Sequence, residues 1–389
     1  MSAPPKRTAL AVDPGFIPAI NATVALYAVE HDPFAGPEII AVAPITESQR
    51  EVWLACQMDP LATLAYNEAS EISLSGPLDA ARLADCWQQV VARHEILRAT
   101  FSPDGEWICF KAAQALAIPL LDFSALAPQE REQALVGLRA DAVQVRFDLE
   151  HGPLLRLSIA KLSADEHRVF LVAHHIAVDG WSAAEIHQNM AALYDGRPLP
   201  PALSYAAFAR DEAAWRQSEE GHATEAYWLA QFQDSVPSFE LPSDHPRSAD
   251  RSFVGGRVDR RLDPQLVAAL RRVGAANGAS LVATTLAAFG ALLHRLSGAE
   301  DLVVGLAAAA QSYLGKNGLV GHAVNLLPLR LKPEADQSFA DYLKHTRGVL
   351  LDAYDHQRFT FGSLLPNFRT RRTAGMHLRP AEPCQRRQA

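Results

Sequence analysis

The amino-acid sequence predicts an α/β fold in which helices and strands alternate along the chain and divide between two halves. The chain has 389 residues, which corresponds to two or three domains at about 150 residues each. Hydrophobic residues make up 49% and charged residues 21% of the chain, a composition typical of proteins that fold around a large core. Residues 235–251 are rich in proline and charge, so we expect them to link the two halves.

The segment before the first half is predicted to be a leader or linker. Residues 1–43 contain scattered prolines and show no sustained periodicity. The first half is expected to span residues 44–234. Its first helix should follow Thr46, because a threonine before an acidic, helix-forming turn is typical of a helix start.

Helical and strand-like patterns alternate through the first half. Apolar residues at helical spacing predict helices, and short apolar runs predict strands. The expected helices are residues 80–94, 127–144 and 205–231, and the expected strands are residues 71–74, parts of 98–121, 154–162 and 169–173. The last of these strands is wholly apolar, as expected for a buried strand.

The second half, residues 252–367, continues the mixture without a visible repeat. The expected elements are a strand at 256–262, a helix at 264–276, a buried helix from Ala279 or Ser280, and a strand at 302–305. The uncharged run 273–293 is long enough to span a bilayer, but its glycine, asparagine and threonine residues favour a buried helix. We therefore expect no membrane partner.

Charge and cysteine content disfavour several classes of protein. Thirty-six Lys and Arg against 44 Asp and Glu give a net charge of −8, without the basic footprint of a nucleic-acid-binding protein. The four cysteines show no CxxC or Cys/His spacing, so neither a metal site nor a disulfide framework is predicted. We identify no signal peptide and expect a reducing, cytoplasmic setting.

One motif carries most of the functional signal. The strand 169–173 leads into His174-His175-Ile176-Ala177-Val178-Asp179-Gly180, ahead of a helix expected to start near Ser182. A strand end holds a side chain rigidly, and a neutral imidazole there can accept a proton near neutral pH. Asp179 could hold the loop through an ion pair, and Gly180 allows backbone geometry that a side chain would block.

The residues alone leave other interpretations of this motif open. His174 and His175 can be satisfied core histidines beside a turn. A metal site is disfavoured because no third histidine or cysteine lies at ligand spacing. A serine hydrolase is disfavoured because Ala184 stands where the GxSxG pattern needs its second glycine.

The motif resembles a known family signature. Residues 174–182 are similar to the HHxxxDG signature of condensation domains of nonribosomal peptide synthetases. Other segments resemble further motifs of that family, in the family's order: residues 45–53, 93–101, 205–209, 320–330 and 356–361. The resemblance covers about residues 44–365.

This resemblance implies a fold and an activity. Family members have two chloramphenicol-acetyltransferase-like lobes, each an α+β sandwich, arranged in a V with a tunnel between them. An upstream donor and a downstream acceptor carrier protein present thioesters on 4′-phosphopantetheine arms. The acceptor amine attacks the donor thioester and forms an amide. The chain itself is expected to bind no cofactor, and its reaction belongs to nonribosomal peptide biosynthesis.

The resemblance also implies roles for individual residues. His175 is the central catalytic residue, either as general base or as the group that positions the amine and stabilises charge. The N–H of Gly180 is expected to be an oxyanion donor. His174, Asp179 and Arg98 are expected to support the site, with Arg98 as the salt-bridge partner of Asp179. The predicted tunnel residues are Asn325, Ser182 and Trp181.

Two residues keep alternative roles, and other residues narrow the subtype of condensation domain that the chain resembles. Asn325 can satisfy a backbone group instead of lining a tunnel, and Trp181 can serve packing. The intact His174-His175 pair argues against cyclisation domains, which carry Asp there, and the extra motifs of epimerisation domains are not found. The segment 321–325 departs from the commoner Gly-x-Phe-Val-Asn and resembles condensation domains of hybrid polyketide–peptide lines.

The last residues depart from the family pattern. Residues 368–389 are rich in arginine where the family has an RDxSRxPL-like seventh motif. They are either an ordinary basic tail or the result of a frame or domain broken near residue 370, which would leave the second lobe incomplete. Two alternatives to an amide-forming transferase follow, namely a noncatalytic carrier-docking remnant and a stand-alone acyltransferase that uses a soluble acceptor.

Overall fold

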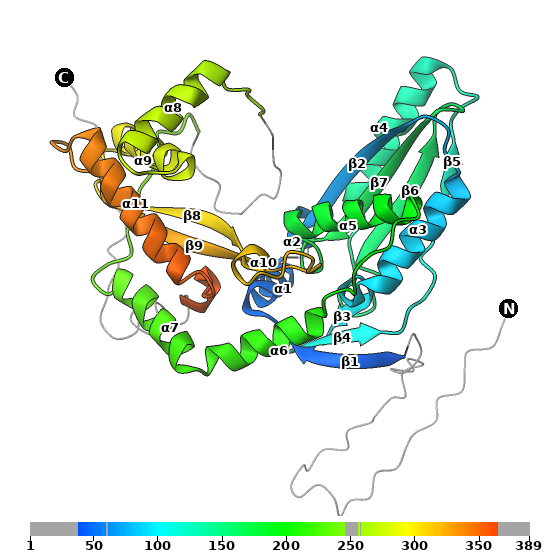
Figure 1. Cartoon of the computed structure of the whole chain (residues 1–389), viewed down its shortest axis with the longest axis horizontal. Coiled ribbons are helices and arrows are strands. Elements are labelled where there is room, and N and C mark those ends of the chain that lie inside the picture. Colours follow the sequence, from blue (N-terminus) through cyan, green and yellow to red (C-terminus); the bar gives the residue numbers. More distant parts are fainter. Residues whose placement is uncertain (1–37, 60, 246–255, 257, 365–389) are drawn as a thin grey trace, which may run out of the picture.

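The computed structural model describes residues 38–59, 61–245, 256 and 258–364, and it shows two arms that form a V (Figure 1). The first arm comprises residues 39–216 and holds one hydrophobic core, and the second arm comprises residues 219–364 and holds another. Helices α6 (Tyr205–Arg216) and α7 (Glu219–Gln231) run along the base of the V (Figure 1). The predicted mixture of helices and strands in two lobes is confirmed.

The first arm is built on two sheets. One is antiparallel, with the strand order β1 (Ile39–Pro44), β4 (Trp107–Lys111), β3 (Ala99–Phe101). The other has the order β2 (Asn67–Ser75), β7 (Glu166–His174), β6 (Leu155–Lys161), β5 (Leu120–Asp122), with β5 parallel to β6. The last six residues of β7 are all buried, so the strand delivers its end rigidly.

Besides α6, the first arm has four longer helices: α1 (Glu47–Met58), α3 (Ala80–Arg93), α4 (Pro128–Gln144) and α5 (Gly180–Tyr194). Thr46 begins α1 as predicted, because its hydroxyl accepts the Gln49 N–H while the Gln49 side chain accepts the Thr46 N–H. Leu83 and Trp87 of α3 are fully buried, and a buried leucine contributes about 1.5–3 kcal/mol by leaving water.

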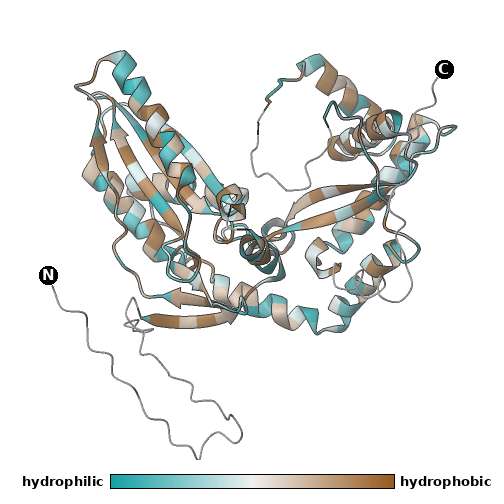
Figure 2. Cartoon of the chain, turned by 180° about the vertical axis from the view of Figure 1, so that it is seen from behind, coloured by the Kyte–Doolittle hydropathy of each residue, from teal (hydrophilic) through white to brown (hydrophobic). Residues whose placement is uncertain are grey.

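The second arm combines helices with a two-stranded sheet. Its elements are α8 (Pro264–Ala276), α9 (Leu281–Ser297), β8 (Leu302–Ala309), α10 (Ala310–Tyr313), β9 (Val324–Leu331) and α11 (Phe339–Asp355). β8 and β9 pair in antiparallel fashion, and hydrophobic residues run along both (Figure 2). Ser280 caps α9 as predicted, since its hydroxyl accepts the Ala283 N–H at 3.2 Å.

The chain changes from one core to the other earlier than predicted. The expected single helix 205–231 is two helices, because α6 ends at Arg216 and Ser218 caps a new helix, α7. Tyr205 of α6 belongs to the first core, whereas Trp228 of α7 belongs to the second. Residues 235–245 of the predicted linker therefore lie within the second arm, and residues 246–251 lie outside the described residues.

Other predicted boundaries also need correction. Residues 39–43 were expected in the leader, but they form β1, whose apolar residues pair with β4. No strand forms at residues 256 and 258–262, and the strand expected at 302–305 extends to Ala309. The predicted leader up to residue 37 and the Arg-rich tail lie outside the described residues.

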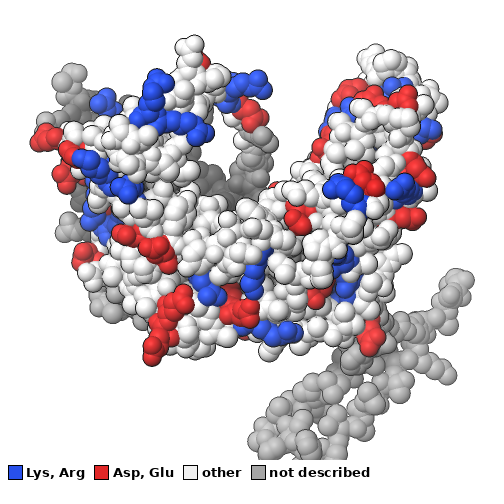
Figure 3. All heavy atoms as spheres, in the orientation of Figure 1, with Lys and Arg blue, Asp and Glu red and all other residues white. Residues whose placement is uncertain are grey.

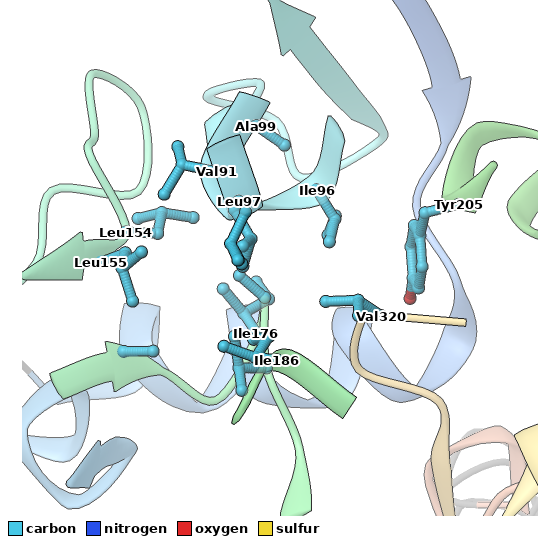
Figure 4. Packing of buried hydrophobic residues seen from close by; sticks show 14 of the residues in the cluster. Val91, Ile96, Leu97, Ala99, Leu154, Leu155, Ile176, Ile186, Tyr205 and Val320 are labelled. Atoms are coloured by element: carbon cyan, nitrogen blue, oxygen red, sulfur yellow. The ribbon is translucent and has the colours of Figure 1, made fainter. Parts of the chain in front are cut away.

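A crossing segment, residues 310–323, joins the two arms. It follows β8 of the second arm, yet Ala310, Leu319, Val320 and Ala323 are buried in the first core. Val320 lies between Ile176 of the histidine loop and Tyr205 of α6 (Figure 4). The first core is therefore completed by residues from the later half of the chain.

The described helices do not include one that could cross a membrane alone. Only α8 and α9 taken together reach the required length and hydropathy, and they are bent by 99° at the break between them. This break falls within the uncharged run 273–293.

Three glutamates gather where α1, α6 and the end of the described chain meet. Glu51 accepts the Gly362 N–H at 2.7 Å, and Glu212 accepts the Glu47 N–H at 2.8 Å. Burial raises the pKa of Glu51 to about 7, and burial likewise raises the pKa of Glu212 to about 7. At pH values between about 5 and 7, both carboxyl groups are therefore largely protonated in the folded state and largely ionised in the unfolded state.

We predict that the double variant Glu51→Gln/Glu212→Gln gains stability relative to the wild type as the pH rises from about 5 to 8. The folded-state pKa values lie above the unfolded ones, so the free energy of unfolding falls as the wild-type carboxyls ionise. The difference between the two proteins should grow by about 1–3 kcal/mol. Denaturant titrations at several pH values measure it, with the exposed Glu219→Gln as control. A constant difference would contradict the prediction.

Candidate active site

The two motif histidines occupy different environments at the end of β7. His174 is fully buried, its Nδ1 accepts the Ile176 N–H at 3.2 Å, and its Nε2 lies 3.7 Å from Cys56 Sγ. Burial, with smaller effects of the nearby histidines, lowers the pKa of His174 to about 3. His174 is thus a neutral core histidine with both ring nitrogens partnered.

His175 is the accessible member of the pair. Its side chain is 27% exposed, and its backbone N–H donates to the Tyr66 carbonyl at 2.8 Å. Nδ1 lies 2.9 Å from the Val178 carbonyl oxygen, which can only accept, so Nδ1 carries the proton. In the neutral ring Nε2 therefore keeps its lone pair and can accept a proton.

Asp179 is the buried centre of the histidine loop. Its Oδ1 accepts both the N–H and the hydroxyl of Ser182 at 2.7 Å, which caps α5. Its Oδ2 accepts the Gln311 side-chain amide at 2.8 Å and the Ala323 N–H at 3.0 Å. The loop is thus held to the crossing segment by hydrogen bonds, and the predicted ion pair is not formed.

Arg98 does not contact Asp179, so the predicted salt bridge is wrong. The Arg98 guanidinium instead donates to the carbonyls of Val91 at 2.9 Å and Ala92 at 2.6 Å. It closes the C-terminal end of α3, where free carbonyls favour a cation. Arg98 also borders a cavity of about 350 Å³, and no residue of the histidine loop lines that cavity.

Gly180 and Ser182 begin α5. Gly180 is its first residue, so its N–H has no acceptor within the helix. Ser182 is fully buried, and its hydroxyl accepts the Gly321 N–H at 2.9 Å. Ser182 therefore ties α5 to the crossing segment, and a role in lining a tunnel remains a prediction.

The other two predicted tunnel residues bind backbone groups of the second half. Trp181 donates from its indole to the Asn317 carbonyl at 2.8 Å. Asn325 is buried and donates to the Gln357 carbonyl at 2.7 Å. The backbone interpretation of Asn325 thus agrees with the structure, and the tunnel role of both residues remains a prediction.

The site lies at the base of the V. The end of β7 and the start of α5 meet α10 there (Figure 1). A hollow separates the arms above it (Figure 3). Among the described residues, no group of three His, Cys, Asp or Glu side chains is placed to hold a metal ion. The chemistry that this arrangement can supply is proton transfer and hydrogen bonding by side chains.

Sequence reasoning missed two side chains beside His175. His322 is buried, and its ring packs edge-on against that of His175 with centroids 4.7 Å apart. Burial, and then the neighbouring His175, lower the pKa of His322 well below its usual value, so its ring is neutral. Glu68 of β2 places Oε1 3.6 Å from His175 Nε2. The only sequence signal was the unusual histidine at position 322.

Close packing fixes the part of the crossing segment that carries His322. Gly321 has φ of +147°, and a Cβ there would lie 2.0 Å from the Tyr205 ring. The Tyr205 hydroxyl donates to the His322 carbonyl. Only glycine fits at position 321, and this contact fixes the backbone that carries His322.

Asp179→Ala is expected to lower the free energy of unfolding by about 3–5 kcal/mol, because it removes the cap of α5 and leaves the Ala323 N–H and one of the two Gln311 amide hydrogens without an acceptor. Chemical denaturation measures the loss. Asp195→Ala is the matched control, since this exposed residue at the end of the same helix should change stability by less than about 0.5 kcal/mol. Equal effects of the two substitutions would contradict the prediction.

A family model described as "Condensation domain" matches residues 39–379 of the chain. Tyrocidine synthase 2 of Brevibacillus parabrevis is 34% identical over 326 residues, which is 84% of this chain and 9% of that protein. Chondramide synthase cmdD of Chondromyces crocatus is 33% identical over 344 residues, covering 86% of this chain and 9% of that protein. The chain thus spans less than a tenth of these relatives.

Solved structures share the fold. The first condensation domain of the CDA synthetase is 26% identical with a TM-score of 0.70, and the match covers 85% of this chain and 78% of that one. The condensation domain of the Monacolin K polyketide synthase MokA is 24% identical with a TM-score of 0.73, covering 85% of this chain and 77% of that one. This second likeness concerns the fold alone.

Proposed function

Because the chain belongs to the condensation-domain family, we propose that it forms an amide bond between a donor acyl or peptidyl thioester and the amine of an acceptor aminoacyl thioester. Both substrates are carried on the 4′-phosphopantetheine arms of carrier proteins, one upstream and one downstream. The setting is nonribosomal peptide biosynthesis, including hybrid polyketide–peptide lines.

The geometry of His175 is the observation that carries this proposal. Its Nδ1 proton is engaged by the Val178 carbonyl, which leaves the Nε2 lone pair available. The acceptor nitrogen attacks the thioester carbon, so a C–N bond forms and the C–S bond breaks. Nε2 accepts the amine proton and returns it to the leaving thiolate. The N–H of Gly180 is our proposed donor to the oxyanion.

Holding two tethered reactants in line should supply much of the acceleration. Well-oriented reactants gain on the order of 7–11 kcal/mol, whereas general base catalysis contributes about 10²–10⁴-fold. Asp179 contributes indirectly, because it fixes both the start of α5 and the crossing segment beside His175. Loss of the imidazole should therefore reduce the rate strongly without abolishing substrate binding.

We predict that His175→Ala lowers amide formation by about 10²–10⁴-fold while leaving the melting temperature nearly unchanged. Intact-mass detection of product on an acceptor carrier protein, with donor- and acceptor-loaded carriers, measures the rate. His222→Ala, an exposed histidine of α7, is the matched control and should retain activity. Equal product from His175→Ala and wild type would refute the role of His175. Absence of product from wild type across a panel of loaded carriers would argue against the transferase function.

A further inference from the structure

Glu68 lies beside the reactive atom of His175. β2 pairs with β7 so that Glu68 is opposite Ala173 and Asn67 is opposite His174. This register brings the Glu68 carboxylate to the end of β7, where its Oε1 lies 3.6 Å from His175 Nε2. The Glu68 side chain is 52% exposed, so it is open to a substrate.

No fixed cation neutralises Glu68 in the described part of the chain. No arginine or lysine there lies within ion-pair distance of its carboxylate. Glu71 on the same strand is paired with both Arg139 and Arg168. Among the described residues, the one ion-pair contact of Glu68 is therefore His175 itself, the group proposed to take the amine proton.

Asp179, the acidic residue of the histidine motif, does not offer a free carboxylate oxygen. Both oxygens of Asp179 are occupied by Ser182 and the crossing segment. On another side of the His175 ring lies His322, which is buried and neutral, so it supplies no competing cation. The contacts of His175 thus combine one carboxylate that no arginine or lysine neutralises with uncharged neighbours.

We propose that Glu68 recognises the acceptor's amino group, which reaches the site as an ammonium ion. This inference rests on the proposed function. The carboxylate accepts one N–H and holds the nitrogen next to His175 Nε2. Nε2 takes one proton from the ammonium and passes it to solvent, and the neutral amine attacks the thioester. A C–N bond forms, the C–S bond breaks, and a second amine proton leaves with the thiolate, so the products are amide, thiol and one proton.

Binding without a donor tests this role separately from catalysis. The probes are glycyl-pantetheine and acetyl-pantetheine in which an amide replaces the thioester, so that the two differ only in the amine. NMR titration of the full chain gives both affinities. Wild type should prefer the glycyl compound. Glu68→Gln should weaken its binding by about 10- to 100-fold and change acetyl binding less than threefold.

Glu71→Gln is the matched control, because it makes the same change on the same strand at a carboxylate already paired with arginine. It should keep the glycyl preference. Equal affinities of wild type for the two probes, or an unchanged preference in Glu68→Gln, would overturn the proposal. Because no donor is present, a glycyl preference that depends on Glu68 supports the proposal whether or not the wild type forms an amide. Failure of the wild type to form an amide would count against the proposed function alone.

Discussion

The buried carboxylate of Asp179 is the interaction on which the rest of the site depends. Taking a charge out of water is costly unless hydrogen bonds replace the lost hydration, and Asp179 receives four from Ser182, Gln311 and Ala323. Two of these bonds cap α5 and two hold the crossing segment. The positions of His175 and His322 are therefore set by one group, although they come from opposite halves of the chain.

Local signals in the sequence predicted local structure well. Thr46 and Ser280 begin helices because their hydroxyls accept backbone N–H groups, and that chemistry is visible in a few residues. The boundary between the cores was misjudged, because proline content marks exposed chain and does not reveal which core a helix joins. β1 was missed for the same reason, since its apolar run follows a proline-rich segment.

The candidate site was predicted only as far as its residues are neighbours in the sequence. His175 and Asp179 were identified from one motif. Glu68 and His322 reach His175 through strand pairing and through the crossing segment, and such distant contacts leave no periodic signal. Arg98 was assigned to Asp179 from the family resemblance, but a long guanidinium can bind carbonyls as readily as a carboxylate, and the end of α3 is nearer.

The crossing segment also determines how this chain could be recombined with a relative. A chimaera joined between α6 and α7 would look like a clean exchange of arms, yet it would place a foreign segment 310–323 into the native first core. Gly321 leaves no room against Tyr205 for any side chain that a foreign segment brings. The natural unit of exchange is therefore discontinuous, and it consists of the first arm together with residues 310–323.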